Sequence, residues 1–333
     1  MAANLRRVEP HLIVEPDDGL DPVLDLIAAA RDTLRIKQFT FTDEALVDAV
    51  IERRAAGVDV RVMLNAAKSG GERANDETFD RLRDAGVTVA WTNPAFYVTH
   101  EKSIVVDRSA ALIATFNLCT KYFTRTRDFG VVTTDPGQVA QIIEVFEADW
   151  AHGNWVPANN SGLLWSNSNS RVVMAQFIDT ATTHLDVQHP KFVDAVILDR
   201  IVAAADRGVK VKVLCGGRHG ISDSDVLDTF SSLRTLNYFG IKVNKQKNLR
   251  AHAKVVIVDR ERALVGSMNI DRSAFDLRRE LGVTVDDPVI VDRLITVFKQ
   301  DWASSRRYLA PDPLIPEEHV ETDFPHDPEL VHE

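Results

Sequence analysis

The chain repeats itself, and this internal repeat constrains the fold more than any other feature of the sequence. Residues 100–107 (HEKSIVVD) match residues 252–259 (HAKVVIVD) at an offset of 152. Further matches at this offset pair Asn117 with Asn269, Asp128 with Glu280, and the VFxxDW segments at 145–150 and 297–302. Agreement at so many positions indicates two tandem copies of one unit.

The length also favours two units, because 333 residues are about twice a typical single domain. With 45% hydrophobic and 26% charged residues, the composition is that of a soluble globular chain. We expect a first repeat over 1–152, a linker over 153–170, a second repeat over 171–308 and an acidic, proline-rich tail over 309–333. The linker is predicted because that segment is rich in Asn, Ser and Gly.

Each copy has the pattern of an α/β unit, in which strands alternate with helices that end at a glycine. In the first copy we expect strands at 34–41, 58–64, 87–91, 102–106 and 111–114, and helices at 44–56 and 77–85. In the second copy we expect strands at 185–188, 209–214, 242–244, 254–258 and 263–265, and helices at 193–207 and 225–236. A further helix closing on Asp-Trp ends each copy.

The net charge of −10 is concentrated in the tail. Residues 309–333 hold eight acids and five prolines but no Lys or Arg, and without those eight acids the net charge is −2. This composition predicts an extended or disordered segment. Net charge therefore does not decide what the rest of the chain binds.

The sequence shows neither a membrane span nor a secretory leader. No run reaches the roughly 18 to 20 uncharged apolar residues that a span needs, and Val8-Glu9-Pro10 stands where a leader has its apolar core. Two cysteines, Cys119 and Cys215, exclude a disulfide scaffold and a thiolate-rich metal site. We expect a cytoplasmic protein.

The repeated histidines and lysines have the spacing of neighbours on one face of a strand. Residues two apart in a strand share a face, so His100 should project with Lys102, and His252 with Lys254. One H-x-K is a weak signal by itself, since a single buried histidine is usually structural. Two copies in the same register favour a functional site.

The repeated acids fall into two groups. Asp107 and Asp259 lie seven residues after their histidines, an odd spacing that turns them away, so we expect turn or structural roles. Asp128 and Glu280 lie 28 residues after the histidines and are the candidates to hold the imidazoles. A carboxylate bonded to one ring nitrogen fixes the tautomer and supports positive charge on the ring.

These paired H-x-K-x4-D elements, the second followed by Gly-Ser-Met-Asn at 266–269, resemble the phospholipase D superfamily. The resemblance runs from about residue 10 to 305. Within the superfamily the chain is most similar to the bacterial phospholipase D and cardiolipin-synthase-like branch, on the segments 115–118 and 163–166. The first copy departs from the pattern, because Ala114-Thr115 stands where the family has Gly-Ser.

The resemblance implies two tandem α/β units related by a pseudo-twofold axis, with mixed sheets flanked by helices and one active site at their interface. Each copy would give this site one His, one Lys and one Asn. Thr115 and Ser267 are the expected phosphate contacts, since Thr115 keeps the hydroxyl. By resemblance, His100 is the nucleophile and His252 the general acid; the residues alone allow the exchange of these roles.

The chemistry of phosphodiester transfer fits the same residues. A nitrogen nucleophile and an acid for the leaving alcohol are needed, and one neutral imidazole with one imidazolium would supply both at pH 7. Four groups would stabilise charge on the non-bridging oxygens, namely Lys102, Lys254, Asn117 and Asn269. These donors would remove the need for magnesium, so we expect no metal and no cofactor.

The loops before the two histidines differ in character. The first contains Phe96 and Tyr97, and the second contains Lys245 and Lys247. An apolar lip facing a cationic lip suits an amphiphile with an anionic headgroup, which favours a phospholipid substrate and peripheral membrane contact. Plain surface loops are an equally simple interpretation of both segments. Because the duplicated chain can build the whole site, we expect a monomer.

Three alternatives stay open. A nuclease of the same superfamily would need more clustered Lys and Arg than one basic loop. A non-catalytic lipid-binding module is favoured only by the altered Ala114-Thr115. Metal binding is disfavoured, because the lysine beside each histidine opposes a divalent cation.

Overall fold

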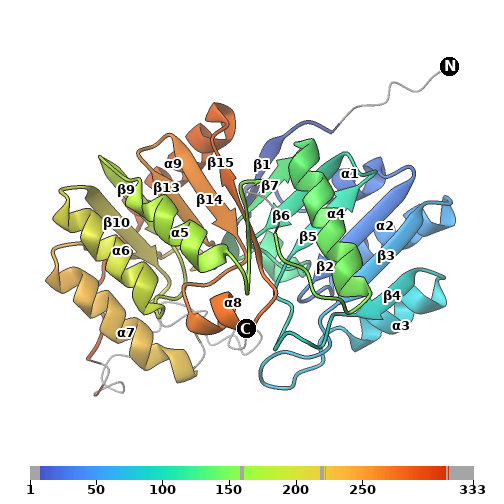
Figure 1. The fold of residues 1–333 in the computed structure, drawn as a ribbon, viewed down its shortest axis with the longest axis horizontal. Coiled ribbons are helices and arrows are strands. Elements are labelled where there is room, and N and C mark those ends of the chain that lie inside the picture. The colour runs from blue at the N-terminus through green and yellow to red at the C-terminus, as the bar shows by residue number, and fades with distance from the viewer. Residues whose placement is uncertain (1–7, 158–160, 218–220, 222, 313, 315–333) are drawn as a thin grey trace.

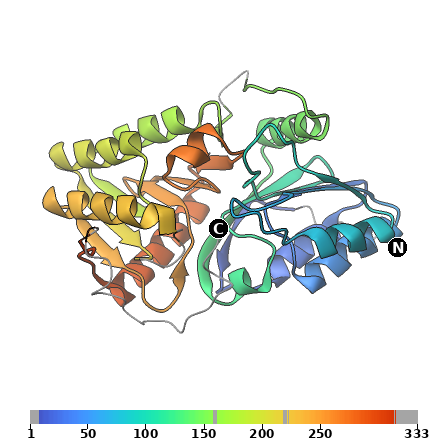
Figure 2. The same ribbon diagram turned by 90° about the horizontal axis from the view of Figure 1, so that it is seen from below.

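The structure is a computed structural model that describes residues 8–157, 161–217, 221, 223–312 and 314. Two mixed sheets lie side by side, and helices cover both faces of each (Figures 1 and 2). This arrangement confirms the predicted fold class. Most of the predicted acidic tail lies outside the described residues. Among the described residues, no helix has the length and apolarity that crossing a bilayer would require.

The first copy forms a sheet with strand order β1-β7-β6-β5-β2-β3-β4. Its elements are β1 (His11–Glu15), α1 (Asp21–Ala29), β2 (Thr33–Gln38), α2 (Glu44–Ala55), β3 (Asp59–Leu64), α3 (Asp76–Asp84), β4 (Thr88–Trp91), β5 (Ser103–Val106), β6 (Ala110–Ala114), the 3-10 helix η1 (Thr120–Phe123), β7 (Thr126–Thr133) and α4 (Pro136–Trp150). β2, β3 and β4 are parallel, and the other pairings along this path are antiparallel.

The second copy forms a sheet with strand order β16-β11-β10-β9-β13-β14-β15-β8. Its elements are β8 (Leu163–Trp165), α5 (Ser170–Asp179), β9 (His184–Gln188), α6 (Ala195–Asp206), β10 (Lys210–Cys215), α7 (Asp223–Tyr238), β11 (Lys242–Lys245), β12 (Arg250–Ala251), β13 (Val255–Val258), β14 (Arg262–Gly266), α8 (Arg272–Asp276), β15 (Leu281–Val285), α9 (Pro288–Ser304) and β16 (Arg306–Arg307). β9, β10 and β11 are parallel, so the central pairing of the first sheet is repeated.

The helix ends show the same repetition. Asp43 caps α2 by accepting a hydrogen bond from the Leu46 amide, and Asp194 caps α6 in the same way. Gly57 and Gly208, which follow these helices, have φ values of 92° and 87°. This left-handed conformation favours glycine, as the sequence predicts.

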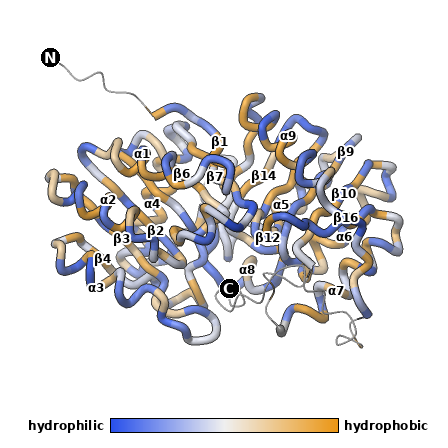
Figure 3. Tube along the Cα trace, turned by 180° about the vertical axis from the view of Figure 1, so that it is seen from behind, coloured by the Kyte–Doolittle hydropathy of each residue, from blue (hydrophilic) through white to orange (hydrophobic). Residues whose placement is uncertain are grey.

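Three apolar clusters form the core. One lies under α1 and α2 of the first copy, and a second lies under α5, α6 and α7 of the second copy. The third contains residues of α4, α9 and strands of both sheets, so it joins the copies into one body. In Figure 3, apolar stretches in orange alternate with polar ones along the elements of both units.

Backbone pairing also crosses between the copies at two symmetry-related places. β12 of the second copy pairs in parallel with β7, with Arg250 opposite Thr126. In the corresponding place, Thr99 of the first copy forms a bridge with Arg279. Each segment that leads to a repeated histidine is thereby fixed beside the acid-bearing segment of the other copy.

Two details differ from the sequence prediction. The predicted linker 153–170 contains β8, which adds an edge strand to the second sheet by pairing with β15. Its three residues, Leu-Leu-Trp, are fully buried, and burial outweighs the turn-rich composition around them. Each H-x-K segment also lies just ahead of its strand, since β5 and β13 begin one residue after the lysines.

Candidate active site

His100 is held by an acid of the other copy. Its Nδ1 lies 2.9 Å from Oε2 and 3.1 Å from Oε1 of Glu280, and both side chains are buried. A hydrogen on Nδ1 donated to this carboxylate leaves the lone pair on Nε2. Nε2 is fully enclosed and has no hydrogen-bond partner among the described residues.

His252 forms the reciprocal pair. Its Nδ1 lies 2.6 Å from Oδ1 of Asp128 in the first copy, and its Nε2 lies 2.7 Å from the amine of Lys254. Tyr122 packs beside this ring, with centroids 4.9 Å apart. The corresponding lysine, Lys102, donates instead to the backbone carbonyl of His100 at 2.8 Å. The two halves of the site are therefore similar but unequal.

Burial dominates the ionisation of both imidazoles. Desolvation lowers the pKa of His252 to about 4, although Asp128 favours the charged ring. Desolvation also lowers the pKa of His100 well below its ordinary value, and the charges of Lys102 and Arg278 lower it further. These shifts favour the neutral form of both rings without substrate. Loss of hydration therefore opposes the imidazolium that the sequence predicts on one of them.

The two acids respond differently to burial. Burial raises the pKa of Glu280 to about 7, because its charged form loses hydration. Burial acts in the same direction on Asp128, but the charge of His252 and its hydrogen bond outweigh it, so the pKa of Asp128 lies below its ordinary value. Thr126 also donates a hydrogen bond to Asp128 at 2.6 Å.

The two hydroxyls predicted to contact phosphate make hydrogen bonds within the protein. Thr115 donates to Asp128 at 2.6 Å and accepts from the amide of Phe129 at 2.9 Å. Ser267 accepts from the amide of Leu281 at 3.1 Å, the matching position of the second copy. Both side chains are fully buried. The Ala114-Thr115 departure therefore keeps the hydroxyl in the equivalent place.

The remaining repeated polar residues, one asparagine and one lysine in each copy, are buried. Asn117 follows β6 and Asn269 follows β14, and Oδ1 of Asn269 is enclosed without a hydrogen-bond partner among the described residues. Lys102 and Lys254 are each about 1% exposed. The charged form of Lys254 lowers the pKa of His100 as well as that of His252, and burial in turn lowers the pKa of Lys254 well below its ordinary value.

Asp107 and Asp259 lie in the turns that follow β5 and β13. Asp107 accepts hydrogen bonds from the amides of residues 31–33, and Asp259 accepts from the amides of residues 182–184. Their φ values are 49° and 54°. Each carboxylate thus ties a turn to the start of the neighbouring strand.

The two predicted lips differ from expectation. Tyr97 is 59% exposed, but Phe96 is half-buried, with the guanidinium of Arg279 4.1 Å from its ring centroid. Lys247 is exposed, whereas Lys245 is buried at the end of β11, 6.0 Å from the ring of Tyr308. Lys245 is therefore not part of an exposed cationic lip, because β11 extends through it.

Two buried ion pairs between the copies were missed by the sequence interpretation. Arg127 pairs with Asp301 at 3.0 Å, and Arg279 pairs with Asp149 at 2.9 Å. Asp149 also contacts the amine of Lys37 at 2.7 Å. The signal was present, because each arginine precedes a candidate acid and each aspartate belongs to the repeated Asp-Trp motif.

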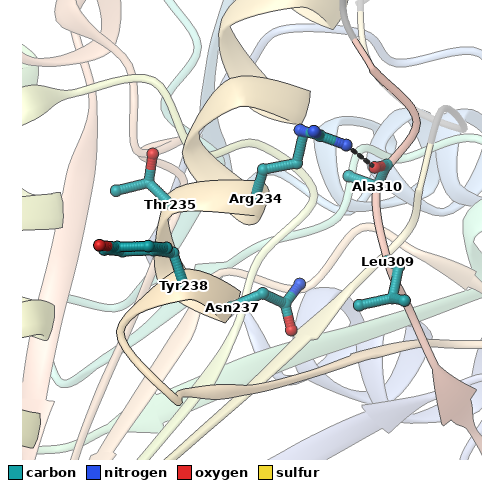
Figure 4. Close-up of a pocket in the computed structure, with 6 residues that line it drawn as sticks. All are labelled: Arg234, Thr235, Asn237, Tyr238, Leu309 and Ala310. Carbon is teal, nitrogen blue, oxygen red and sulfur yellow. Dashed lines mark hydrogen bonds between the residues drawn. The ribbon is translucent and has the colours of Figure 1, made fainter.

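A cavity of about 530 Å³ lies away from these residues, at the end of α7 (Figure 4). It is lined by Arg234, Thr235, Asn237, Tyr238, Leu309 and Ala310. The carbonyl of Ala310 accepts a hydrogen bond from Arg234 at 3.3 Å. It contains none of the repeated His, Lys, Asn or acid residues. Among the described residues, no group of three His, Cys, Asp or Glu side chains is placed to hold a metal ion.

The fold and site define a class: a duplicated α/β protein in which each copy supplies one imidazole and orients the imidazole of the other. The family model described as "Cardiolipin synthase, PLD-like domain" matches residues 23–150 and 174–302, one segment in each copy. These segments make up most of the chain. The protein therefore belongs to the PLD-like family, in its cardiolipin-synthase-like branch, and is an enzyme of the phosphatidyltransferase or phospholipase D type.

Similar proteins extend over most of the chain. The major cardiolipin synthase ClsA of Bacillus subtilis is 24% identical, with 89% of this chain and 69% of that protein covered. Cardiolipin synthase A of Pseudomonas aeruginosa is 26% identical, with 91% and 68% covered.

Two solved structures share the fold. Phosphatidylserine synthase of Haemophilus influenzae has a TM-score of 0.71 at 14% identity, covering 93% of this chain and 89% of that one. Polyphosphate kinase of Porphyromonas gingivalis has a TM-score of 0.71 at 16% identity, covering 91% of this chain and 50% of that one. At these identities the likeness concerns the fold alone.

Proposed function

We propose that this protein is a metal-independent phosphatidyltransferase that works through a covalent phosphohistidine on His100. The observation that carries the proposal is the pair of reciprocal imidazole–carboxylate contacts, His100 with Glu280 and His252 with Asp128, made between the two copies. The cardiolipin synthase names of the similar proteins support a phospholipid substrate.

His100 is the better nucleophile of the two. Its Nδ1 is held by Glu280, and its Nε2 has no partner among the described residues. Nε2 of His252 instead lies against the amine of Lys254. In the first step, Nε2 of His100 forms a bond to phosphorus, and the bond from phosphorus to the headgroup oxygen breaks. The electron pair of that bond goes to the leaving oxygen.

His252 supplies the proton that the leaving oxygen needs. Its pKa of about 4 must therefore rise when substrate binds. An anionic phosphodiester brought beside the ring favours the imidazolium, and Asp128 stabilises that charge from the other side. Substrate binding and activation of the general acid are thus coupled through charge.

The second step reverses these roles. His252 accepts the proton of an arriving hydroxyl, the hydroxyl oxygen attacks phosphorus, and the bond from phosphorus to Nε2 of His100 breaks. A hydroxyl of a second lipid gives transfer, whereas water gives hydrolysis. In both steps four groups stabilise the charge on the non-bridging oxygens, namely Lys102, Lys254, Asn117 and Asn269.

We also propose that the protein contacts the membrane surface beside the site. The amide of Tyr97 donates to the carbonyl of Leu277 at 2.9 Å, so these residues of the two copies are neighbours. Both are large apolar side chains and more than half exposed, at 59% and 54%. They flank the segments that lead to His100 and Glu280, where an acyl chain of a bound phospholipid would pass.

The test is a lipid assay in mixed micelles that contain a chelator. Purified protein is given phosphatidylglycerol, with and without added isotope-labelled glycerol, and products are identified by mass. Formation of a lipid with two phosphatidyl groups supports transfer, and phosphatidic acid indicates hydrolysis. Loss of all lipid turnover in chelator would overturn the proposal. Cleavage of DNA or RNA by the same preparation, with lipids untouched, would assign the site to a nuclease.

A further inference from the structure

Arg278 is a buried cation without a counter-charge in contact. It is 7% exposed, and its Nε is fully enclosed. No hydrogen bond or ion pair joins its guanidinium to a described residue. The neighbouring Arg279 shows the usual pattern, because it pairs with Asp149 and donates to the carbonyl of Ser166. An unpaired guanidinium loses hydration without compensation, so the site favours an anion.

The local backbone directs Arg278 toward the candidate active site. Arg279 bridges Thr99, and alternate residues of such an extended segment share a face. Arg278 and Glu280 therefore project together. The first copy shows this relationship directly, because the corresponding Thr126 donates to Asp128 at 2.6 Å. In agreement, the charge of Arg278 lowers the pKa of His100 and opposes the rise in the pKa of Glu280.

This cation breaks the symmetry between the copies. Thr126 holds the acid of its own copy, whereas Arg278 makes no hydrogen bond to Glu280. The second acid is thus positioned without help from this residue. Support of Glu280 does not explain why a charged residue is buried at position 278. A role that the first copy lacks explains it better.

Nearby charges do not neutralise Arg278. Asp271 is the other acid whose pKa the charge of Arg278 lowers, but burial opposes its ionised form and Lys191 favours that form more than Arg278 does. Asp271 already lies 3.1 Å from the amine of Lys191, and that amine also bonds Asp225 at 2.6 Å. Lys191 is therefore the principal partner of Asp271.

We infer that Arg278 binds a non-bridging oxygen of a phosphodiester in the lipid substrate, as a substrate-binding residue confined to the second copy. This inference rests on the proposed function. A guanidinium suits the role because it offers several donors in one plane to phosphate oxygens. The phosphodiester belongs either to the lipid that reacts at His100 or to a phospholipid that serves as acceptor.

The experiment compares Arg278→Gln with wild type and with Arg272→Gln. Arg272 lies on α8 six residues earlier, and its side chain is 87% exposed, so it is a matched control. In the first arm, thermal unfolding is followed at increasing inorganic phosphate. We expect phosphate to stabilise wild type and R272Q, and to bind R278Q about tenfold more weakly, as loss of one charged contact implies.

In the second arm, transfer from phosphatidylglycerol is measured with isotope-labelled glycerol or with phosphatidylglycerol as acceptor, because transfer to unlabelled glycerol regenerates the donor lipid. If Arg278 holds the reacting phosphate, KM for the donor rises about tenfold in R278Q with both acceptors. If it holds the acceptor phosphate, transfer to phosphatidylglycerol falls while transfer to glycerol is unchanged. R278K should recover part of either loss, because it restores the charge without the planar donors.

Two results would overturn the inference. One is a phosphate affinity and both transfer rates in R278Q that equal those of wild type. The other is a loss of activity with phosphate affinity unchanged, which would assign the charge to the ionisation of Glu280. Lipid turnover missing in wild type would refute the proposed function instead, and the phosphate arm would still report on Arg278. Should R278Q fail to fold, R278K and R278M are compared in both arms.

Discussion

Glu280 reaches Nδ1 of His100 at 2.9 Å, although 180 residues separate them in the chain. The same relationship joins Asp128 to His252 across 124 residues. Each copy therefore orients the imidazole that the other copy supplies. The pairing follows from the backbone contacts of Thr99 with Arg279 and of β12 with β7, which bring these segments together.

His100→Ala should abolish turnover, because the proposed nucleophile is gone. A loss of at least about a thousandfold is expected, with no phosphorus label retained on the protein. His252→Ala should still become labelled with a substrate whose leaving group needs no proton. A phosphohistidine is lost in acid, so the labelled protein is trapped and analysed at alkaline pH. Label on H100A with none on H252A would reverse the two roles.

Glu280→Gln and Asp128→Asn should lower kcat by about 10² to 10⁴ with smaller changes in KM, as for acids that orient a catalytic imidazole. The two effects should differ with leaving group: D128N should recover with a good leaving group, since it acts through His252.

In wild type, kcat should have a bell-shaped pH dependence from the coupled imidazoles, because kcat reports the substrate complex, in which the pKa of His252 is proposed to rise. A flat rate from about pH 5 to 9 would contradict the assignment.

Glu15 should make stability fall as pH rises. Its carboxylate is fully buried in β1 beside Asp128, and burial followed by the charge of Asp128 raises its pKa from 4.5 to about 8. The folded state therefore holds a proton that the unfolded state releases above pH 4.5. Stability is greatest below that pH and is lost up to about pH 8, by at most roughly 1.4 kcal/mol for each pKa unit.

Glu15→Gln removes this ionisable group while keeping its shape. Thermal unfolding between pH 5 and 8.5 should show a smaller decline in the variant than in wild type. Glu280, with a pKa raised to about 7, contributes in the same direction, so E280Q is measured in parallel. An equal decline in wild type and E15Q would show that Glu15 is not protonated in the folded protein.

Asp149→Ala should be more destabilising than Asp301→Ala. Asp149 is buried and compensates two cations, Lys37 at 2.7 Å and Arg279 at 2.9 Å. Asp301 compensates Arg127, which also contacts the part-exposed Asp17. Removing Asp149 should lower the free energy of unfolding by about 3–5 kcal/mol. Urea unfolding measures the free energy of unfolding of both variants.

The matched control for this comparison is Asp84→Ala. The Asp84 side chain is 73% exposed, and its change should stay within about 0.5 kcal/mol. If D301A were less stable than D149A, this would contradict the view that Asp149 compensates more buried positive charge than Asp301 does.

Asp259→Ala should lower the free energy of unfolding, while the molecules that remain folded keep their activity. The carboxylate accepts hydrogen bonds from the amides of residues 182–184, and loss of these contacts should cost roughly 1–3 kcal/mol. Burial opposes its ionisation, but these hydrogen bonds hold the pKa of Asp259 below its ordinary 3.8. Its contribution is therefore present above that pH and is lost on acidification.

The readout for Asp259 is urea unfolding together with kcat per folded molecule. D259N keeps a side chain that tolerates the φ of 54° and should lie between wild type and D259A. A variant with normal stability and no activity would place this residue in the chemistry instead.

Repetition explains why so much of this architecture could be predicted. Two copies in one register identified His100 and His252 as a pair and marked Asp128 and Glu280 as their acids. Which acid serves which ring could not be predicted, because each acid is equally distant from its own histidine in the chain. Only the backbone bridges between the copies decide it.

Positions that break the repeat were harder to interpret. β8 lies in a segment whose Asn, Ser and Gly content favours turns, and three buried residues make it a strand. Lys245 belongs to β11 and not to a basic loop, because strand pairing continues one residue further than the apolar pattern. Arg278 has no equivalent charge in the first copy, so comparison of the copies gave no reason to select it.

The crossing of β12 onto β7 limits how the enzyme can move. A hinge that separated the two halves would break this pairing, the bridge at Thr99 and both imidazole–carboxylate contacts together. Opening and closing of the halves is therefore incompatible with keeping the two imidazole–carboxylate pairs intact. In the proposed reaction, a lipid would then have to enter and leave without separation of the two halves.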